Sequence, residues 1–101
     1  MPERTGDALL EPVWFVEATY APDAAETRKP FRAEHLAGIR KRLDAGVYIE
    51  AGAFADVSAS VVLVRAESAE AAIDLVRDDV YLRTGVWVEV RARAFGRVTR
   101  P

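Results

Sequence analysis

The sequence predicts an α+β protein of the ferredoxin-like class, with helices packed on an antiparallel sheet. The first observation is the order of the segments, because strand-like and helix-like patterns follow one another as β-α-β-β-α-β. The second is that two of the strand-like segments are apolar on both faces, as is expected of strands in the middle of a sheet. The four predicted strands span residues 13–20, 47–56, 58–67 and 86–98.

The strands differ in composition, and this difference orders them within the sheet. The segments VWFVEATY (13–20) and SASVVLVRAE (58–67) are rich in aromatic and β-branched residues and are apolar on both faces for much of their length. We therefore place these two strands in the centre. The segments 47–56 and 86–98 mix charged residues into one face, which is typical of strands at the edges.

Two helices connect the strands. The first spans 31–45, and Gly46 follows it at the position of a left-handed C-terminal cap. Its apolar residues form one helical stripe: Leu36, Ile39 and Leu43. The second helix begins after Ser68, whose side chain is suited to cap its N-terminus. The segment 21–30 is predicted as a loop with one helical turn, and 78–85 as a turn region.

One face of the predicted sheet has no cover from the chain itself. Both crossovers should be right-handed, so both helices lie on the same face. The opposite face then exposes apolar side chains, which usually marks an interface. We expect a second copy to cover it, giving a two-fold homodimer, a dimeric α+β barrel. The alternative is a monomer covered by its own tails, but residues 1–12, predicted as an N-terminal extension to a domain spanning 13–101, are polar.

Composition excludes several classes of protein. A net charge of −2 argues against nucleic acid or an anionic membrane as a partner. The absence of cysteine excludes disulfides and thiolate metal sites, and a single histidine without a tight carboxylate cluster argues against a metal site of other ligands. The spacing of a glycine-rich phosphate loop is absent, which argues against a phosphate-binding loop. No cofactor is predicted. The N-terminus lacks an apolar signal segment and no stretch could span a membrane, so a cytoplasmic protein is expected.

His35 is the only histidine, and it lies beside the apolar stripe of the first helix with Arg32 one turn before it. One interpretation is a boundary histidine that bonds a nearby backbone group. The other is an imidazole held by a carboxylate and acting as a general acid or base near neutral pH. The second interpretation needs a carboxylate from elsewhere in the fold, and Asp78 and Asp79 are the candidates.

Four segments in this order resemble the YCII-related family: FRAEHLAGIRKRLDAG, AGAFAD, SAEAA and DDVYLRTGVWVEVRARAF. The resemblance covers nearly the whole chain after the first dozen residues. It implies a dimeric ferredoxin-like barrel with a His-Asp pair in a pocket next to the dimer interface. By position, the family histidine, aspartate, arginine and strand glycine fall on His35, Asp79, Arg32 and Gly52.

Two positions depart from the family pattern. Ala53 and Val80 stand where the family has proline, after the strand glycine and after the aspartate. Proline fixes the backbone φ angle, so its loss can loosen both turns. This leaves Asp78 as a rival to Asp79 for the pairing with His35.

The predicted function is proton transfer, as in an elimination or isomerisation, on a small organic molecule that is anionic or aromatic. His35 would transfer the proton, Asp79 would orient the imidazole, and Arg32 would bind an anionic group. The candidate walls of the pocket are aromatic: Trp14, Phe15, Phe54 and Tyr81. Two alternatives are a non-catalytic ligand-binding or sensing module and a cofactor-free oxygenase. Ser58 and Ser60 also leave a Ser-His-Asp triad open, although no nucleophile-elbow motif supports it.

Overall fold

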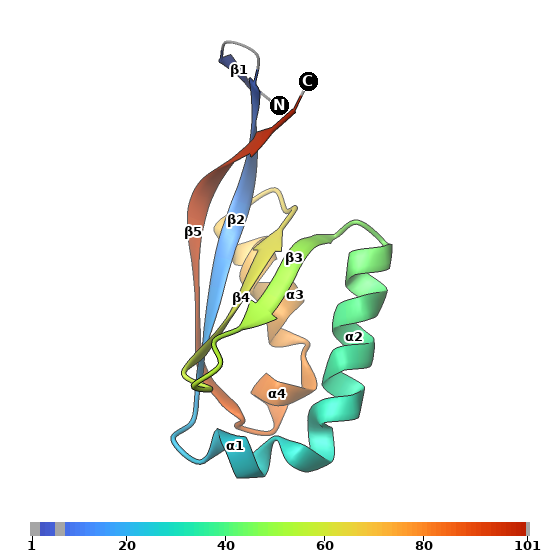
Figure 1. Ribbon diagram of the computed structural model, residues 1–101, viewed down its shortest axis with the longest axis vertical. Helices are drawn as coiled ribbons and strands as arrows, with labels where there is room; N and C mark the ends of the chain where they lie inside the picture. The colour runs from blue at the N-terminus through green and yellow to red at the C-terminus, as the bar shows by residue number, and fades with distance from the viewer. Residues whose placement is uncertain (1–2, 6–7, 101) are drawn as a thin grey trace.

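The computed structural model describes residues 3–5 and 8–100, and the predicted ferredoxin-like order is present in it (Figure 1). The strands are β1 (Glu3–Thr5), β2 (Ala8–Tyr20), β3 (Tyr48–Ala53), β4 (Ala59–Val64) and β5 (Trp87–Thr99). The helices are α1 (Ala24–Thr27), the 3-10 turn η1 (Lys29–Phe31), α2 (Arg32–Asp44), α3 (Ala69–Arg77) and α4 (Val80–Arg83).

The sheet is antiparallel, and its main strands follow the order β5-β2-β4-β3. The prediction that the two apolar strands lie in the centre is confirmed, because β2 and β4 occupy these positions. Inward side chains of β2 and β4 share one core with residues of α3, α4 and the start of β5. The largest fully buried side chains of that core are Trp87, Tyr48 and Tyr81.

The ends of both long helices follow the sequence signals. Gly46 has a φ of 76° and its N–H donates to the Leu43 carbonyl oxygen at 3.1 Å, which closes α2. Only a residue without a Cβ adopts this conformation without strain. At the start of α3, the Ser68 hydroxyl accepts a hydrogen bond from the Ala71 N–H at 3.0 Å. Both predicted caps are therefore confirmed.

The apolar stripe of α2 is not its buried side. Leu36 is 49% exposed and Leu43 is 38% exposed, whereas His35 is the buried residue of this helix. The reason is that α2 lies along the edge strand β3 and against the single turn α4 rather than over the middle of the sheet. The His35 side of α2 therefore faces the core, and of the two interpretations of His35 the boundary histidine disagrees with this burial.

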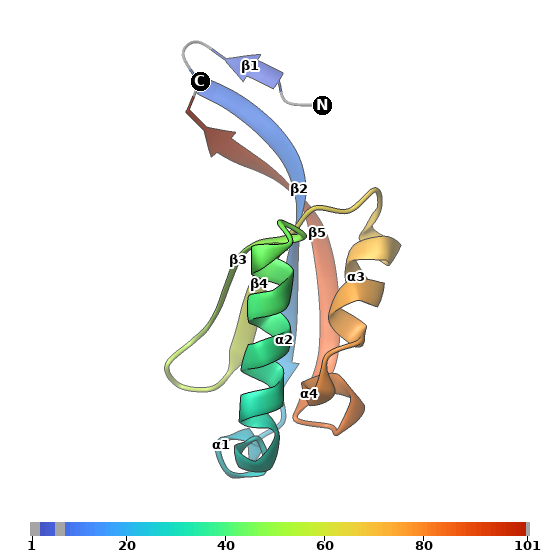
Figure 2. The same ribbon diagram turned by 90° about the vertical axis from the view of Figure 1, so that its right-hand side faces the viewer.

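The first predicted strand is longer than expected. β2 begins at Ala8 rather than at residue 13, so residues 8–12 of the predicted extension belong to a strand, whereas β5 is shifted by only one residue from the predicted 86–98. Beyond the end of β4 these two strands form a curved arm, whose far end also pairs with β1, and Figure 2 shows it extending past the helices. Glu11 on this arm bonds Arg65 at 2.8 Å and Arg97 at 2.9 Å, which ties the arm to the chain after β4.

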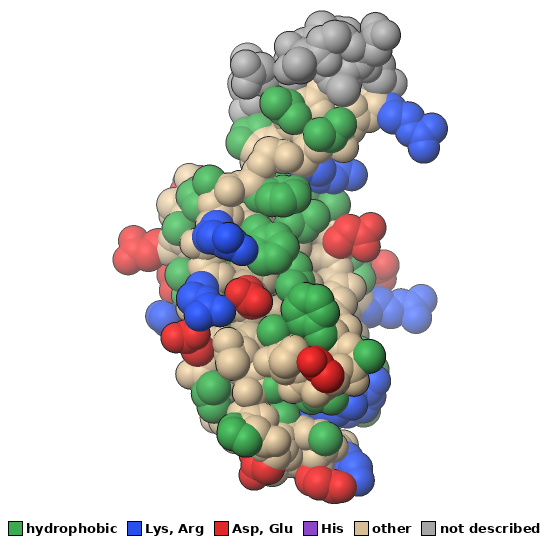
Figure 3. Space-filling view, turned by 60° about the vertical axis from the view of Figure 1, so that its left-hand side comes forward, with side chains coloured by type: hydrophobic (Ala, Val, Ile, Leu, Met, Phe, Trp, Pro, Cys, Tyr) green, Lys and Arg blue, Asp and Glu red, His purple; other side chains and the backbone are tan. Residues whose placement is uncertain are grey.

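The sheet face opposite the helices carries apolar side chains with charged ones beside them (Figure 3). Phe15 packs against Phe95 with 5.9 Å between ring centroids, and Phe95 is 42% exposed. The Arg93 guanidinium lies 5.3 Å from the centre of the Phe15 ring. The expectation that this face exposes apolar groups is therefore confirmed for the isolated chain.

Candidate functional site

The candidate site is built around α4, a single helical turn between α3 and β5. Asp79 is the N-cap of α4, and its side chain accepts a hydrogen bond from the Tyr81 N–H at 2.8 Å. A carboxylate at this position satisfies a backbone donor of the first turn and lies at the positive end of that turn. The turn forms although Val80 stands where the family has proline. Asp79 is therefore fixed in space by the backbone that follows it.

His35 and Asp79 form a buried pair. The His35 Nδ1–H donates to the two carboxylate oxygens of Asp79 at 2.8 and 2.9 Å, and their side chains are 9% and 2% exposed. Asp78 instead has a side chain that is 75% exposed and pairs with Arg42 at 2.9 Å. The carboxylate that holds the imidazole is therefore Asp79, and its neighbour Asp78 faces solvent.

Aromatic rings fix the plane of the imidazole. The His35 ring stacks on Tyr81, with 3.7 Å between centroids and 7° between planes, and it meets Trp87 edge-on at 5.3 Å. Because Nδ1 is committed to Asp79, the proton lies on that nitrogen in the neutral ring. Nε2 then carries a lone pair, and it makes no hydrogen bond to any side chain or backbone group in the described part of the chain.

A cavity of about 360 Å³ opens beside this imidazole, between the start of α2 and strands β3 and β4. Volumes of this order suit a small organic ligand. Its apolar walls include Leu36, Ile39, Phe54, Val57 and Val62. Its polar lining consists of Tyr20, Arg28, Arg32, His35, Ser60, Tyr81 and Trp87. Within residues 3–5 and 8–100, none of the cavity-lining side chains is a carboxylate, so the charged groups that face the cavity are cationic.

Of the other predicted site residues, some line the cavity and others do not. Arg32 and Tyr81 line the cavity with His35, and so does the predicted wall Phe54. Trp14 and Phe15 do not: the Trp14 indole donates to the Ala66 carbonyl oxygen at 3.1 Å, and Phe15 lies on the opposite face of the sheet. Phe15 points to the other face of β2, and Trp14 lies too far along the strand from Tyr20 to reach the cavity.

Gly52 lies in the cavity wall, together with Ala53 at the other position where the family has proline. A Cβ built on Gly52 would meet nothing within 4 Å, so neither a bulge nor a close approach requires glycine there. The register shift of β3 lies instead between Tyr48 and Glu50. Gly52 therefore lies in a regular part of β3 and borders the cavity with its backbone.

Several lining residues escaped the sequence analysis, chiefly Tyr20, Arg28 and Trp87. The Ser60 hydroxyl donates to the Tyr20 hydroxyl at 3.0 Å, and both side chains are buried. Ser60 thus pairs with a phenol rather than with His35, and no Ser-His-Asp triad is formed by it. For Tyr20, the alternation of side chains along β2 could have predicted its burial, because Tyr20 follows Val16 and Ala18 on the same, buried face.

Burial raises the pKa of the Tyr81 phenol, and the nearby Tyr20 acts in the same direction. The positive charges of Arg32 and Arg28 oppose this rise. Tyr81 is therefore a neutral hydrogen-bond donor at physiological pH.

The described residues contain no cluster of three or more histidine, cysteine or acidic side chains that could hold a metal ion. None of the helices in the described ranges is long and apolar enough to cross a membrane.

Comparisons with known proteins agree with this fold. Among solved structures, 5-chloro-2-hydroxyhydroquinone dehydrochlorinase (TftG) from Burkholderia phenoliruptrix, in complex with 2,5-dihydroxybenzoquinone, matches with a TM-score of 0.69. The two chains are 18% identical over a match that covers 82% of this chain and 92% of that chain. At this identity the likeness concerns the fold. No curated protein matches the sequence.

The sequence itself matches the family model of the YCII-related domain over residues 13–96. The match runs from within β2 to within β5 and includes His35, Asp79 and the whole cavity lining. The resemblance first noted in four short segments thus extends over most of the chain. This protein belongs to the YCII-related family.

Proposed function

We propose that this protein is an enzyme in which His35 transfers a proton to or from a small organic molecule bound in the cavity. The observation that carries the proposal is the buried His35–Asp79 pair, which leaves Nε2 unbonded next to a cavity of ligand size. Asp79 holds the imidazole in one tautomer and stabilises the imidazolium that forms when Nε2 accepts a proton. Elimination and isomerisation are the reactions that need a single group of this kind.

The cavity lining supports an anionic, aromatic ligand. Arg28 and Arg32 bring two positive charges to the lining, and Phe54 and Tyr81 offer ring faces. Guanidinium groups bind carboxylate and similar anions through paired hydrogen bonds. The structural neighbour is a dehydrochlorinase whose complex holds 2,5-dihydroxybenzoquinone, and an oxygenated six-membered ring of that kind would be compatible with a cavity of about 360 Å³.

Proton exchange tests the proposal without knowledge of the product. A panel of hydroxylated quinones, phenols and small ring carboxylates is incubated with the protein in deuterated water, and NMR follows deuterium entering each compound. We expect His35→Gln to abolish the exchange and Asp79→Asn to reduce it strongly. Asp78→Asn is the matched control, since it removes a neighbouring but exposed carboxylate.

The same panel separates the alternatives. A ligand that binds tightly while no compound exchanges or is consumed would point to a binding or sensing module. Consumption of oxygen would point to a cofactor-free oxygenase. Exchange that persists in His35→Gln would refute the proposed role of the imidazole.

We also propose that two copies pair through the sheet face opposite the helices. The apolar groups Phe15 and Phe95 and the ion pair between Arg91 and Glu17, 2.9 Å apart, lie on this face, and a two-fold axis would bring like surfaces together. Light scattering should give the mass of a dimer for the wild type and of a monomer for Phe95→Glu. Leu43→Glu is the control, because Leu43 is exposed on the helical side. A wild-type monomer would refute the pairing.

A further inference from the structure

Three residues with aromatic hydrogen-bond donors line the cavity together with His35: Tyr20, Tyr81 and Trp87. The ring centroid of Tyr20 lies 6.1 Å from that of Tyr81 and 6.3 Å from that of Trp87. Tyr81 and Trp87 meet edge-on at 5.5 Å. The rings that carry two phenol hydroxyls and one indole N–H therefore belong to a single cluster with the imidazole ring.

Within the described part of the chain, none of these three groups has an acceptor for its own hydrogen. Tyr81 Oη and Trp87 Nε1 are buried and have no hydrogen-bond partner in the described part of the chain. Tyr20 Oη accepts from Ser60, so its own proton is not needed for that bond. A buried donor without an acceptor costs stability, and for the donors whose residues also line the cavity an acceptor on a bound ligand would offset this cost.

The positive charge of the cavity lining favours one kind of hydrogen-bond acceptor on a ligand. Arg28 and Arg32 line the same cavity, and both lie close enough to Tyr81 for their charges to lower its pKa against the effect of burial. In the ranges that the structure describes, the lining offers no carboxylate that would compete for these donors. An oxygen that carries negative charge is therefore the acceptor that this arrangement favours.

We infer that Tyr20, Tyr81 and Trp87 form an oxyanion site, and that the substrate is a carbonyl compound whose oxygen becomes negative when His35 removes a proton. This inference rests on the proposed function and names the class of its substrate. Donors fixed in advance around developing charge stabilise it without reorganisation during the reaction.

The reaction step balances without a further reactant. His35 Nε2 takes a proton from the carbon next to the carbonyl, the C–H electron pair forms a carbon–carbon double bond, and the carbonyl pair moves to oxygen. The three donors hold the resulting enolate. In an isomerisation, the imidazolium returns its proton to a different carbon of the enolate. In an elimination, the enolate expels a leaving group from the β carbon, and the leaving group takes up the proton.

Binding of para-nitrophenol tests the oxyanion site directly, because its ionised form is a stable aromatic oxyanion with visible absorbance. We expect the wild type to bind the phenolate more tightly than the neutral phenol, so that the bound molecule ionises at lower pH than the free one. Tyr20→Phe and Tyr81→Phe should each weaken phenolate binding about tenfold, the effect of one charge-assisted hydrogen bond.

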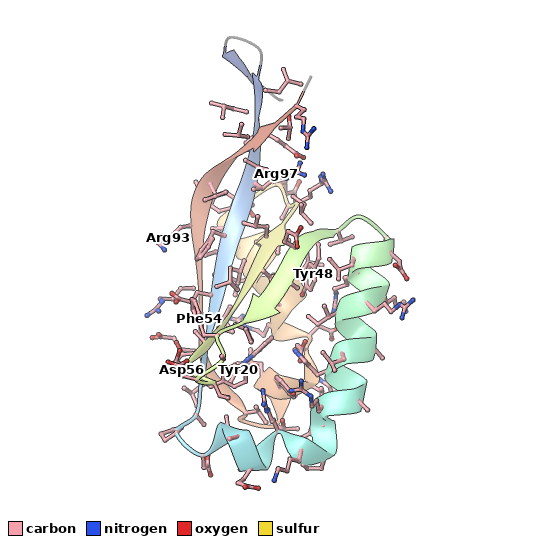
Figure 4. All side chains as sticks on the ribbon, viewed as in Figure 1. Tyr20, Tyr48, Phe54, Asp56, Arg93 and Arg97 are labelled. Atoms are coloured by element: carbon pink, nitrogen blue, oxygen red, sulfur yellow. The ribbon has the colours of Figure 1, made fainter. Side chains whose placement is uncertain are left out.

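Tyr48→Phe is the matched control. Tyr48 Oη is also buried without a partner, but Tyr48 does not line the cavity, and Figure 4 shows it farther along the sheet from Tyr20. Its removal should leave phenolate binding unchanged. If Tyr81→Phe fails to fold, Tyr20→Phe against Tyr48→Phe still decides the question.

The outcomes separate this inference from the proposed function. Equal phenolate binding by Tyr20→Phe, Tyr81→Phe and Tyr48→Phe would overturn the oxyanion site, and so would a wild type that does not prefer the phenolate. Neither result would touch the role of His35, which depends on deuterium exchange in His35→Gln. Exchange that persists in His35→Gln, with phenolate binding lost in the tyrosine variants, would leave an anion site without acid-base catalysis.

Discussion

Asp79→Asn should destabilise the protein by about 2 kcal/mol, because the asparagine NH2 group would replace one of the two carboxylate oxygens that accept from the His35 Nδ1–H. The His35 Nδ1–H lies 2.8 Å from one oxygen and 2.9 Å from the other, and the Tyr81 N–H lies 2.8 Å from the first. Asparagine can keep its oxygen where Oδ1 accepts from both donors, but its NH2 group then lies against the His35 Nδ1–H in place of Oδ2. A hydrogen bond to a charged group contributes about 1.5–3 kcal/mol, so the loss of one sets the estimate.

Urea unfolding followed by tryptophan fluorescence measures this loss, since Trp87 is buried beside the pair. A loss of 2 kcal/mol corresponds to a fall in Tm of about 10 °C for a domain of this size. Asp78→Asn should cost less than about 1 kcal/mol, because its ion pair with Arg42 is exposed. Nitrogen NMR of the single imidazole should show the proton moving to Nε2 in Asp79→Asn alone. Equal stability losses in the two variants, with the same tautomer in both, would refute this reasoning.

Three further predictions concern stability. Ser68→Ala should lower the free energy of unfolding by about 1 kcal/mol in urea unfolding, because the Ala71 N–H loses its cap; an unchanged value would mean that water replaces the serine. Val57 has a φ of 58°, so Val57→Gly should raise the stability by about 1 kcal/mol through relief of strain, and a lower Tm would contradict this. The hydrogen bond from Arg65 lowers the pKa of Glu11 below 4.5, so this ion pair stabilises the fold above pH 4.5 and is lost as the pH falls through the lower folded-state pKa. Glu11→Gln should therefore remove about 0.5 kcal/mol at neutral pH and flatten the acid limb of a Tm-against-pH curve, whereas a parallel curve would argue against the assignment.

The sequence was sufficient for the topology, since each strand and each long helix has its own local pattern. Caps at Gly46 and Ser68 depend on neighbouring residues alone, and both are found in the structure. The orientation of α2 was not predictable in this way. Its apolar stripe and His35 are adjacent on the helix, and only the position of α2 at the edge of the sheet decides which of them is buried.

The choice between Asp78 and Asp79 shows the same limit at the site. The two residues are adjacent and identical in chemistry, and they differ in that Asp79 occupies the N-cap of a turn only four residues long. A turn so short has no helical periodicity to read, so the residues alone left both aspartates open. Tyr20 and Trp87 were missed for another reason: buried aromatic residues usually belong to a core, and only a cavity beside them gives their polar atoms a different use.

The single turn α4 holds both halves of the proposed chemistry, since Asp79 begins it and Tyr81 follows two residues later. A displacement of this turn would release the imidazole and withdraw the phenol together, so any change in the backbone of α4 affects both groups at once. The turn between β3 and β4 supplies Phe54 and Val57 to the opposite wall and none of the proton-handling groups. Substitutions in the turn between β3 and β4 would therefore change which substrates fit the cavity while they leave the groups that handle the proton unchanged.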